Sequence, residues 1–368
     1  MLHNRACKNA PGLRSRKRNL KPISCVFLAL SLVFSITGCS GAGGSKAPSA
    51  KEDKIVTYGQ PDDWANWKEM FAAFNKKYGS THVDTDMSSA EEIQKFGAEK
   101  NNPVADTADI GMMWGPVAVS QGVTMGYKNA NWDKIGDWAK DPDGNWFGTY
   151  VGVPVFLVNT DVVKDVPQSW NDLLKSEYKD MICIANPQTS GSGQNMVLAA
   201  AYALGGDITK VDASIDYFAK LQKEGNIKNI SASVATLQKG EVPIYIVYDF
   251  LAKGYQEDLK GQANFKIVFP KEGSIWAPSA LMINKWSPHP GLAKKFADFV
   301  SSDEGQAIFA EGHAHPIRYV EGNLKLPDDV KSELLPDSFY TNCGKPSEWN
   351  SVSPDEIAQK WGKEVLGQ

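Results

Sequence analysis

Hydrophobic residues recur along most of the chain in two alternating patterns. Short runs rich in β-branched and aromatic residues are typical of buried strands. Between them, apolar residues return every three or four positions, as Trp67, Phe71 and Phe74 do, which predicts helices with one buried face. Predicted strands cover residues 54–58, 83–86, 108–114, 151–159, 181–185, 244–248 and 277–284. Predicted helices lie at or near residues 64–74, 88–92, 170–174, 194–204, 215–224 and 291–300.

This alternation of strand and helix predicts an α/β fold with mostly parallel sheets. Pro154 lies inside the predicted strand at residues 151–159. Because proline cannot donate to a strand ladder, we expect this segment at a sheet edge or as a crossing segment. About 315 residues follow position 52, more than one hydrophobic core usually serves. We therefore expect two domains.

The N-terminus has the pattern of a secretory signal. A basic stretch ending at Lys21 precedes an apolar run at residues 23–36, which is shorter than the roughly 20 residues of a membrane-spanning helix. Small residues come directly before Cys39, and this arrangement resembles the lipobox of bacterial lipoproteins. The resemblance implies cleavage before Cys39 and lipidation of its thiol, with palmitate among the acyl groups. An ordinary signal peptide with a cysteine near its cleavage site is the alternative.

The segment after the signal is rich in Gly, Ser, Ala and Pro. Such a composition cannot bury enough apolar surface to fold, so residues 39–52 are expected to form a flexible tether. Residues 1–38 are accordingly assigned to a signal peptide. The folded part is expected outside the cytoplasmic membrane, at the cell surface or in the periplasm, held by a lipid anchor.

The charge of the chain argues against a nucleic-acid partner. The first 38 residues contain seven of the 39 Lys and Arg residues and none of the 43 Asp and Glu residues. A mature chain therefore has 32 basic and 43 acidic residues, a net charge of −11. Binding to nucleic acid requires a basic face, so we expect no such partner and attribute the acidity to solubility.

Two cysteines follow the proposed lipid site. Cys183 lies in a predicted strand and is expected to be a small buried hydrophobic residue. Cys343 is distant in sequence. An oxidising compartment would permit a disulfide between them, but spacing alone does not establish one.

Several stretches, taken together, resemble the type II periplasmic binding proteins of ABC importers. The most informative runs from Pro288 to Gln306, a predicted helix pair followed by a short return around Arg318. The other matching stretches are residues 99–103, 169–174, 186–193 and 237–241. Their order and spacing make the set specific over residues 53–320. The resemblance is to the branch that includes binders of ferric iron, thiamine, polyamines, phosphonates and sugar phosphates.

The resemblance implies a two-lobed fold and an ABC transport function. One lobe would comprise residues 53–152 with 276–368, and the other residues 153–275. Strands near 153–159 and 269–275 would join them, and the lobes would close on a solute by hinge motion. The partners implied are a small-molecule solute and the permease and ATPase subunits of the importer, with the binding protein itself a monomer.

A run of small hydroxyl-bearing residues and glycine is the first candidate for the binding site. Thr189, Ser190, Gly191 and Ser192 lie between a predicted strand and a helix, where backbone N–H groups and the helix dipole favour an anion. Ser88 and Ser89 offer the same chemistry from the other lobe. Donors from both lobes would clamp an oxyanion, whereas ordinary helix caps with flexible turns are the structural alternative at both places.

Five further residues are candidates because of their place at strand ends. A carboxylate at Asp249 would bind an ammonium group or a hydroxyl, or would cap the following helix. An aromatic ring at such a position either stacks on a ligand or packs in the core. The aromatic candidates are Tyr58, Trp64, Trp114 and Trp276.

No residue pattern indicates a cofactor or a bound metal. His313 and His315 have no accompanying ligand motif and are assigned to packing or hydrogen bonding. Ferric-binding relatives use neighbouring tyrosines, a pattern that Tyr245 and Tyr248 do not meet.

No catalytic motif accompanies these candidates, and we expect a binding protein rather than an enzyme. An extracytoplasmic hydrolase and a structural or adhesive lipoprotein are the alternatives from other classes. Among solutes, an organic phosphate or phosphonate is favoured. A polyamine or thiamine-like cation comes second, because of the acidic charge and the tryptophans, and ferric iron third.

Overall fold

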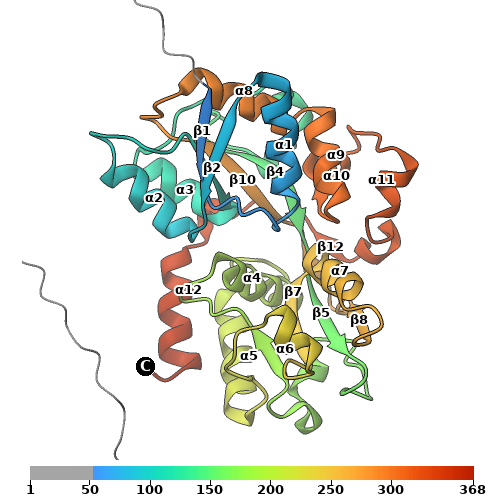
Figure 1. Ribbon diagram of the computed structural model, residues 1–368. Coiled ribbons are helices and arrows are strands. Elements are labelled where there is room, and N and C mark those ends of the chain that lie inside the picture. The colour runs from blue at the N-terminus through green and yellow to red at the C-terminus, as the bar shows by residue number, and fades with distance from the viewer. Residues whose placement is uncertain (1–52) are drawn as a thin grey trace, which may run out of the picture. The chain divides into compact units, whose positions relative to one another are not determined.

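The computed structural model describes residues 53–368, so the predicted signal peptide, tether and lipidated Cys39 lie outside the described residues (Figure 1). Helices flank two principal sheets within this range, and the predicted α/β class is confirmed. Across the described residues, no helix combines the length and the apolar character that spanning a membrane requires.

The larger sheet has six strands in the order β11-β4-β10-β3-β1-β2. The strands are β1 Lys54–Tyr58, β2 Thr81–Thr85, β3 Thr107–Gly111, β4 Phe147–Gly152, β10 Ala277–Ile283 and β11 His315–Pro316. β1 runs parallel to both β2 and β3, whereas β10 is antiparallel to β3 and β4. We call this sheet and the helices on it the first lobe.

The smaller sheet has four strands in the order β6-β7-β5-β8. They are β5 Pro154–Asn159, β6 Ile182–Ile184, β7 Ile244–Tyr248 and β8 Phe265–Val268. β5 is antiparallel to both neighbours, and only β6 and β7 run parallel. Both sheets are therefore mixed rather than mostly parallel as predicted, because β10 enters the first sheet from a crossing segment instead of from a helix. This second sheet and its helices form the second lobe.

The longer helices follow the predicted pattern, whereas the helix predicted at residues 170–174 is a 3-10 turn at Asn171–Leu174. Trp64 lies in the turn before α1, which begins only at Trp67, and Ser88 directly precedes α2 as expected. The main helices are α1 Trp67–Tyr78, α2 Ser89–Ala98, α3 Gly115–Ser120, α4 Gly191–Gly205, α5 Val211–Glu224, α6 Val234–Gln238, α7 Asp249–Asp258, α8 Pro290–Val300, α9 Asp303–Glu311, α10 Ile317–Val320, α11 Asp328–Ser332 and α12 Pro354–Lys360.

An aromatic cluster holds α1 and α8 together in the first lobe. Phe71 stacks on Phe296 with ring centroids 5.3 Å apart, and Phe74 meets Phe296 edge-on at 5.0 Å. Trp67 packs edge-on against Phe309 of α9 at 5.1 Å. These side chains are fully buried, and each contributes about 1.5–3 kcal/mol by leaving water. The helical spacing seen in the sequence therefore marks the face that packs in the core.

The chain passes from the first sheet to the second at one residue, Val153, which separates β4 from β5. Pro154 is the first residue of β5, where a proline is tolerated in a strand. β5 lies between β7 and β8, so the segment does cross between the sheets but is an interior strand rather than an edge.

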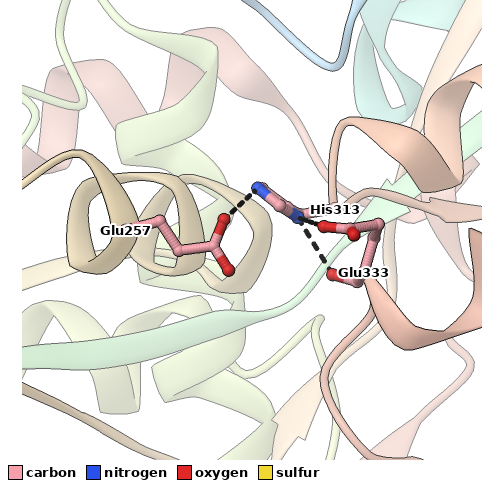
Figure 2. A group of neighbouring side chains, drawn as sticks. All are labelled: Glu257, His313 and Glu333. Carbon is pink, nitrogen blue, oxygen red and sulfur yellow. Dashed lines mark hydrogen bonds and ion pairs between the residues drawn. The ribbon is translucent and has the colours of Figure 1, made fainter. Parts of the chain in front are cut away.

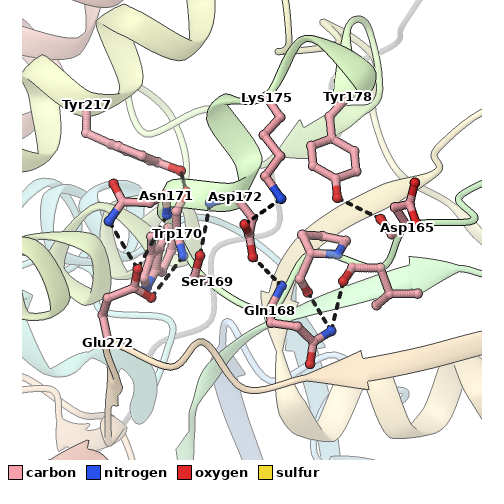
Figure 3. Close-up of polar contacts among 12 residues, drawn as sticks. Asp165, Gln168, Ser169, Trp170, Asn171, Asp172, Lys175, Tyr178, Tyr217 and Glu272 are labelled. Carbon is pink, nitrogen blue, oxygen red and sulfur yellow. Dashed lines mark hydrogen bonds and ion pairs between the residues drawn. The ribbon is translucent and has the colours of Figure 1, made fainter.

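The stretch at residues 169–174 secures the second crossing segment (Figure 3). The backbone N–H of Trp170 donates to Glu272 Oε2 at 3.0 Å, and the Asn171 side-chain amide donates to Oε1 at 3.2 Å. The indole N–H of Trp170 reaches the carbonyl oxygen of Gly273 at 3.3 Å, and the Tyr217 hydroxyl donates to the Trp170 carbonyl at 2.6 Å. This motif therefore has a structural role.

The C-terminal segment packs on the second lobe (Figure 1). α12 contacts α4, and the π-helical turn at Trp361–Val365 contacts α5, where Trp361 meets Phe218 at 5.2 Å. The sequence-based division placed all of residues 276–368 with the first lobe. Residues 354–365 instead pack on helices of the second lobe. The reason is an apolar face that includes Ile357 and Trp361, which is buried by packing against α4 and α5.

Candidate ligand-binding cleft

A cleft of about 450 Å³ is lined by residues of both lobes. The first lobe contributes the ends of β1 and β3 and the start of α2, and the second lobe contributes the start of α4 and the end of β7. The lining residues are Gly59, Pro61, Trp64, Asp86, Met87, Ser88, Ser89, Glu91, Glu92, Asp109, Gly111, Thr189, Ser190, Gly191, Ser192, Asn195, Tyr248 and Ser279.

The N-terminus of α2 forms one wall of the cleft. The hydroxyl and the backbone N–H of Ser88 both donate to Glu91 Oε2, at 2.7 and 2.8 Å. The Ser89 hydroxyl accepts from the backbone N–H of Gly111, at the end of β3, at 3.1 Å. This bond fixes Ser89 Oγ at the cleft and leaves its hydrogen free to donate.

The N-terminus of α4 forms the facing wall. Ser190 caps the helix by accepting from the Gly193 N–H at 3.2 Å, while the first-turn N–H groups of Gly191 and Ser192 have no partner within the helix. A Cβ built on Gly191 would lie 3.7 Å from Ser89 Oγ. The two helix starts therefore meet, and Ser88, Ser89 and residues 189–192 are brought together as the sequence analysis expects.

Trp64 also lines the cleft, held by aromatic and polar contacts. Its indole N–H donates to the Tyr150 hydroxyl at 2.7 Å, and its ring packs edge-on against Phe250 at 5.5 Å. Tyr248, which the sequence analysis did not select, lies beside it at 6.2 Å. Burial raises the pKa of Tyr248 to about 12, and its hydroxyl accepts from the Asn195 amide at 2.6 Å.

Carboxyl groups line the first-lobe side, and sequence reasoning missed them. Burial raises the pKa of Asp109 to about 8, although the hydrogen bond from the Tyr150 hydroxyl, at 2.8 Å, and the Trp67 indole N–H, which does not reach hydrogen-bonding geometry, offset part of the effect. Burial and the nearby acids raise the pKa of Glu92 well above its ordinary value. A usable signal was present, since Glu92 lies one turn before Phe96 on the apolar face of α2 and Asp109 lies inside a hydrophobic strand.

Asp249 lies away from the cleft lining. Its Oδ1 accepts from the Val153 N–H at 2.7 Å, and its Oδ2 accepts from the Tyr340 hydroxyl at 2.5 Å. Trp276 stacks on the same Tyr340 ring at 4.7 Å. Both residues therefore belong to the packing around the crossing segments.

Two other aromatic candidates lie outside the lining as well. Tyr58 points into the first lobe and donates to Glu99 at 2.8 Å. Trp114 is buried behind the helix start, where its indole N–H donates to the side chain of Gln194 at 3.2 Å. Trp114 supports α4 from behind, and Tyr58 anchors the end of α2.

His313 bridges two glutamates (Figure 2). Its Nδ1 contacts the carbonyl oxygen of Glu333 at 2.9 Å, and its Nε2 lies 3.2 Å from Glu257 Oε2. The two glutamates face different ring nitrogens, so the imidazole itself joins α7 to the loop after α11. Burial lowers the pKa of His315 to about 4, which leaves that ring neutral.

The two cysteines within the described residues are free thiols. Cys183 is buried and Cys343 is half-buried. The disulfide that the sequence left open is therefore not formed in this structure.

Comparison with known proteins finds solute-binding proteins among the relatives of this chain. The profile of the family described as bacterial extracellular solute-binding protein matches residues 105–343. A putative 2-aminoethylphosphonate-binding periplasmic protein of Salmonella typhi is 25% identical over 296 residues, which cover 77% of this chain and 82% of that protein.

Two solved structures share the fold. The periplasmic binding protein AfuA of Actinobacillus pleuropneumoniae, with exogenous fructose-6-phosphate bound, superposes with a TM-score of 0.73 and 24% identity, covering 86% of this chain and 99% of its own. The ferric binding protein of Campylobacter jejuni superposes with a TM-score of 0.68 and 18% identity, and the match covers 84% of this chain and 98% of that protein. The predicted two-lobed type II fold is confirmed by these neighbours.

Proposed function

The chain belongs to the bacterial extracellular solute-binding proteins, and on that premise we propose that its cleft captures an organic phosphonate or phosphate. Membership of this family agrees with the resemblance that the sequence motifs indicated. As the binding component of an ABC importer, the protein closes its two lobes on the solute and delivers it to the permease. The proposal assigns no catalytic step and no cofactor to the chain.

One observation carries the proposal: two helix N-termini from different lobes meet in the cleft. The starts of α2 and α4 lie within reach of one another at Ser89 and Gly191. Each helix start favours a negative charge by about 0.3–1 kcal/mol, and free N–H and hydroxyl donors add charge-assisted hydrogen bonds. A dianionic group between them would be held by both lobes, which couples binding to closure.

The names of relatives support the same chemistry. A relative is named for 2-aminoethylphosphonate, and a structural neighbour was solved with a sugar phosphate. Iron binders are also among the neighbours, but the lining of this cleft includes a single tyrosine, Tyr248, whose hydroxyl is protonated at neutral pH. A phenolate pair for ferric iron is therefore not part of the lining that the structure describes.

The location that we propose rests on the signal and lipobox pattern of the sequence up to Cys39. We propose that residues 1–38 are removed, that Cys39 is lipidated, and that residues 39–52 tether a monomeric domain outside the cytoplasmic membrane. This places the cleft where a permease and its ATPase subunits receive the solute.

A thermal-shift and calorimetric panel on residues 40–368 tests the function. The titrants are ethylphosphonate, 2-aminoethylphosphonate, glucose 6-phosphate, spermidine, thiamine and ferric citrate. A bound ligand at a hundredfold excess over Kd raises the free energy of unfolding by about 2.7 kcal/mol. We expect shifts with phosphonates or phosphates, abolished in the double variant Ser190→Ala, Ser192→Ala.

The matched control is Ser233→Ala, which removes the cap of α6, a helix whose residues do not line the cleft. It is expected to lower stability slightly and to leave binding unchanged. Stabilisation by cations or iron alone would overturn the proposed function.

A further inference from the structure

Two buried carboxyl groups in the cleft have an oxygen without a hydrogen-bond partner. Glu92 of α2 is 1% exposed and Asp109 of β3 is 7% exposed, and both line the cleft. Among the described residues, neither Glu92 Oε2 nor Asp109 Oδ1 has a hydrogen bond of ordinary geometry. Buried polar atoms are nearly always paired, so these two oxygens indicate a group that the cleft receives from outside.

The surrounding backbone and side chains orient both carboxyl groups. Gly59 adopts a positive φ of 69°, and a Cβ there would lie 2.0 Å from Glu92 Oε1 and 3.1 Å from the carbonyl oxygen of Asp109. The Glu92 carboxyl is therefore packed against bare backbone beside Asp109. A chain of hydrogen bonds from Trp64 through the Tyr150 hydroxyl engages Asp109 Oδ2, which leaves Oδ1 as the unpaired atom.

The charge of the cleft lining points in the same direction. Four acids line it, namely Asp86, Glu91, Glu92 and Asp109, and no Lys, Arg or His is among its lining residues. Glu91 is already engaged by Ser88 at the start of α2. A phosphonate alone would add negative charge to this acidic lining, whereas a ligand that also carries a cation would balance it.

We propose that Glu92 and Asp109 form a subsite for a primary ammonium group, so that the solute is a short zwitterion with an amine at one end and a phosphonate at the other. This inference rests on the proposed function, because the phosphonate end occupies the facing helix starts. An ammonium group has three donors and no acceptor, which suits two unpaired carboxyl oxygens and the backbone carbonyl of Asp109.

Proton release accompanies binding at this subsite. In the empty cleft, burial and the neighbouring acids, Asp109 foremost, raise the pKa of Glu92 well above its ordinary value and favour its protonated form. Burial raises the pKa of Asp109 to about 8, so this carboxyl also holds its proton near pH 7. When the ammonium group enters, a carboxyl O–H bond breaks, the proton leaves to solvent, and the carboxylate pairs with the cation. The Tyr150 hydroxyl, which faces Asp109, remains protonated throughout.

Isothermal titration of residues 40–368 with 2-aminoethylphosphonate and with ethylphosphonate tests the subsite. We expect the amine-bearing compound to bind at least tenfold more tightly to the wild type. Glu92→Gln should remove most of that difference while leaving the Kd for ethylphosphonate within a factor of about three. The control Glu99→Gln changes an acid just after the same helix, which bonds Tyr58 outside the cleft, and should change neither affinity.

Two further measurements separate folding from binding. Glu92→Gln should unfold at a thermal midpoint no lower than that of the wild type, because it replaces an unpaired carboxyl with a neutral amide. Titration in two buffers of different ionisation enthalpy should show more proton release on binding 2-aminoethylphosphonate to the wild type than to Glu92→Gln, and Asp109→Asn should act in the same direction.

The outcomes distinguish this inference from the proposed function. Equal binding of both phosphonates to the wild type, with no change in Glu92→Gln, overturns the amine subsite and leaves the phosphonate site intact. Failure of both compounds to bind the wild type overturns the proposed function and this inference together.

Discussion

Asp249 hydrogen-bonds to both the backbone N–H and the backbone carbonyl oxygen of Val153. Its carboxylate Oδ1 accepts from the Val153 N–H at 2.7 Å, and its own backbone N–H donates to the Val153 carbonyl oxygen at 2.9 Å. Val153 is the single residue between β4 and β5, where the chain passes from one sheet to the other. The residue that the sequence offered as a cleft carboxylate therefore fixes the geometry of the crossing, and through it the relative position of the two walls of the cleft.

Replacing this carboxylate should lower stability without changing ligand specificity. Asp249→Ala leaves the Val153 N–H and the Tyr340 hydroxyl without their acceptor, so we expect a loss of about 1–3 kcal/mol in the free energy of unfolding, measured by urea titration. Asp207→Ala removes an exposed acceptor of the Thr209 N–H and is the control, with a loss under about 1 kcal/mol. A change in the preference among solutes would contradict the structural role of Asp249.

Stability should fall as the pH rises from about 4 to about 8. Burial raises the pKa of Asp109 to about 8, whereas an unfolded Asp titrates near 3.9. In that window the native carboxyl keeps a proton that the unfolded chain has lost, so the native state binds more protons and the free energy of unfolding decreases with pH.

Asp109→Asn should make this dependence shallower, on the order of a few kcal/mol over the whole window. Some slope should remain, because the shift of the Glu92 pKa has the same sign. Urea unfolding of both proteins at several pH values measures it, and an identical slope in wild type and variant would show that Asp109 does not titrate as described.

Gly59 and Gly79 form a matched pair for testing the close approach of Glu92. Both have a positive φ, 69° and 65°, so alanine strains the backbone equally, by about 1 kcal/mol. Only at Gly59 would the new Cβ meet a neighbour, Glu92 Oε1 at 2.0 Å, since nothing lies within 4 Å of a Cβ at Gly79. Gly59→Ala should therefore lower both stability and ligand affinity, and Gly79→Ala stability alone. Equal affinities in the two variants would argue against a role for the Glu92 position.

The first turn of α4 allows a second such pair. A Cβ on Gly193 would lie 2.2 Å from the Ala185 carbonyl oxygen, so Gly193→Ala should displace the helix start and destabilise the fold by about 1–3 kcal/mol. A Cβ on Gly191 meets nothing closer than 3.7 Å, so Gly191→Ala should fold normally.

The added methyl at Gly191 points towards Ser89 across the cleft, and we expect it to weaken phosphonate binding by tenfold or more. Calorimetry and thermal unfolding of both variants separate the two effects. Unchanged binding in Gly191→Ala would mean that the two helix starts do not close on the ligand.

Local pattern was sufficient for most of the longer helices and strands and for the donors at the two helix starts, although it missed β8 at Phe265–Val268. The spacing of Trp67, Phe71 and Phe74 identified a buried helix face, and Ser88 and Ser190 identified helix starts, because caps and periodicity depend on neighbours within a few residues. The motif at residues 288–306, together with the shorter matching stretches, indicated a family of binding proteins, and the match to the solute-binding family confirmed it.

Which side chains enter the cleft was decided by tertiary structure. Tyr248 and Asp249 are adjacent at the end of β7, yet Tyr248 lines the cleft and Asp249 turns to the crossing segment. Trp64 lies at the cleft, while Trp114 and Trp276 do not, although each follows or precedes a strand. The sequence fixes which residues alternate or recur, but only the order of strands and the packing of the lobes determine which side of a strand end faces the ligand. The unpaired oxygens of Glu92 and Asp109 likewise exist only because α2 and β3 meet around Gly59.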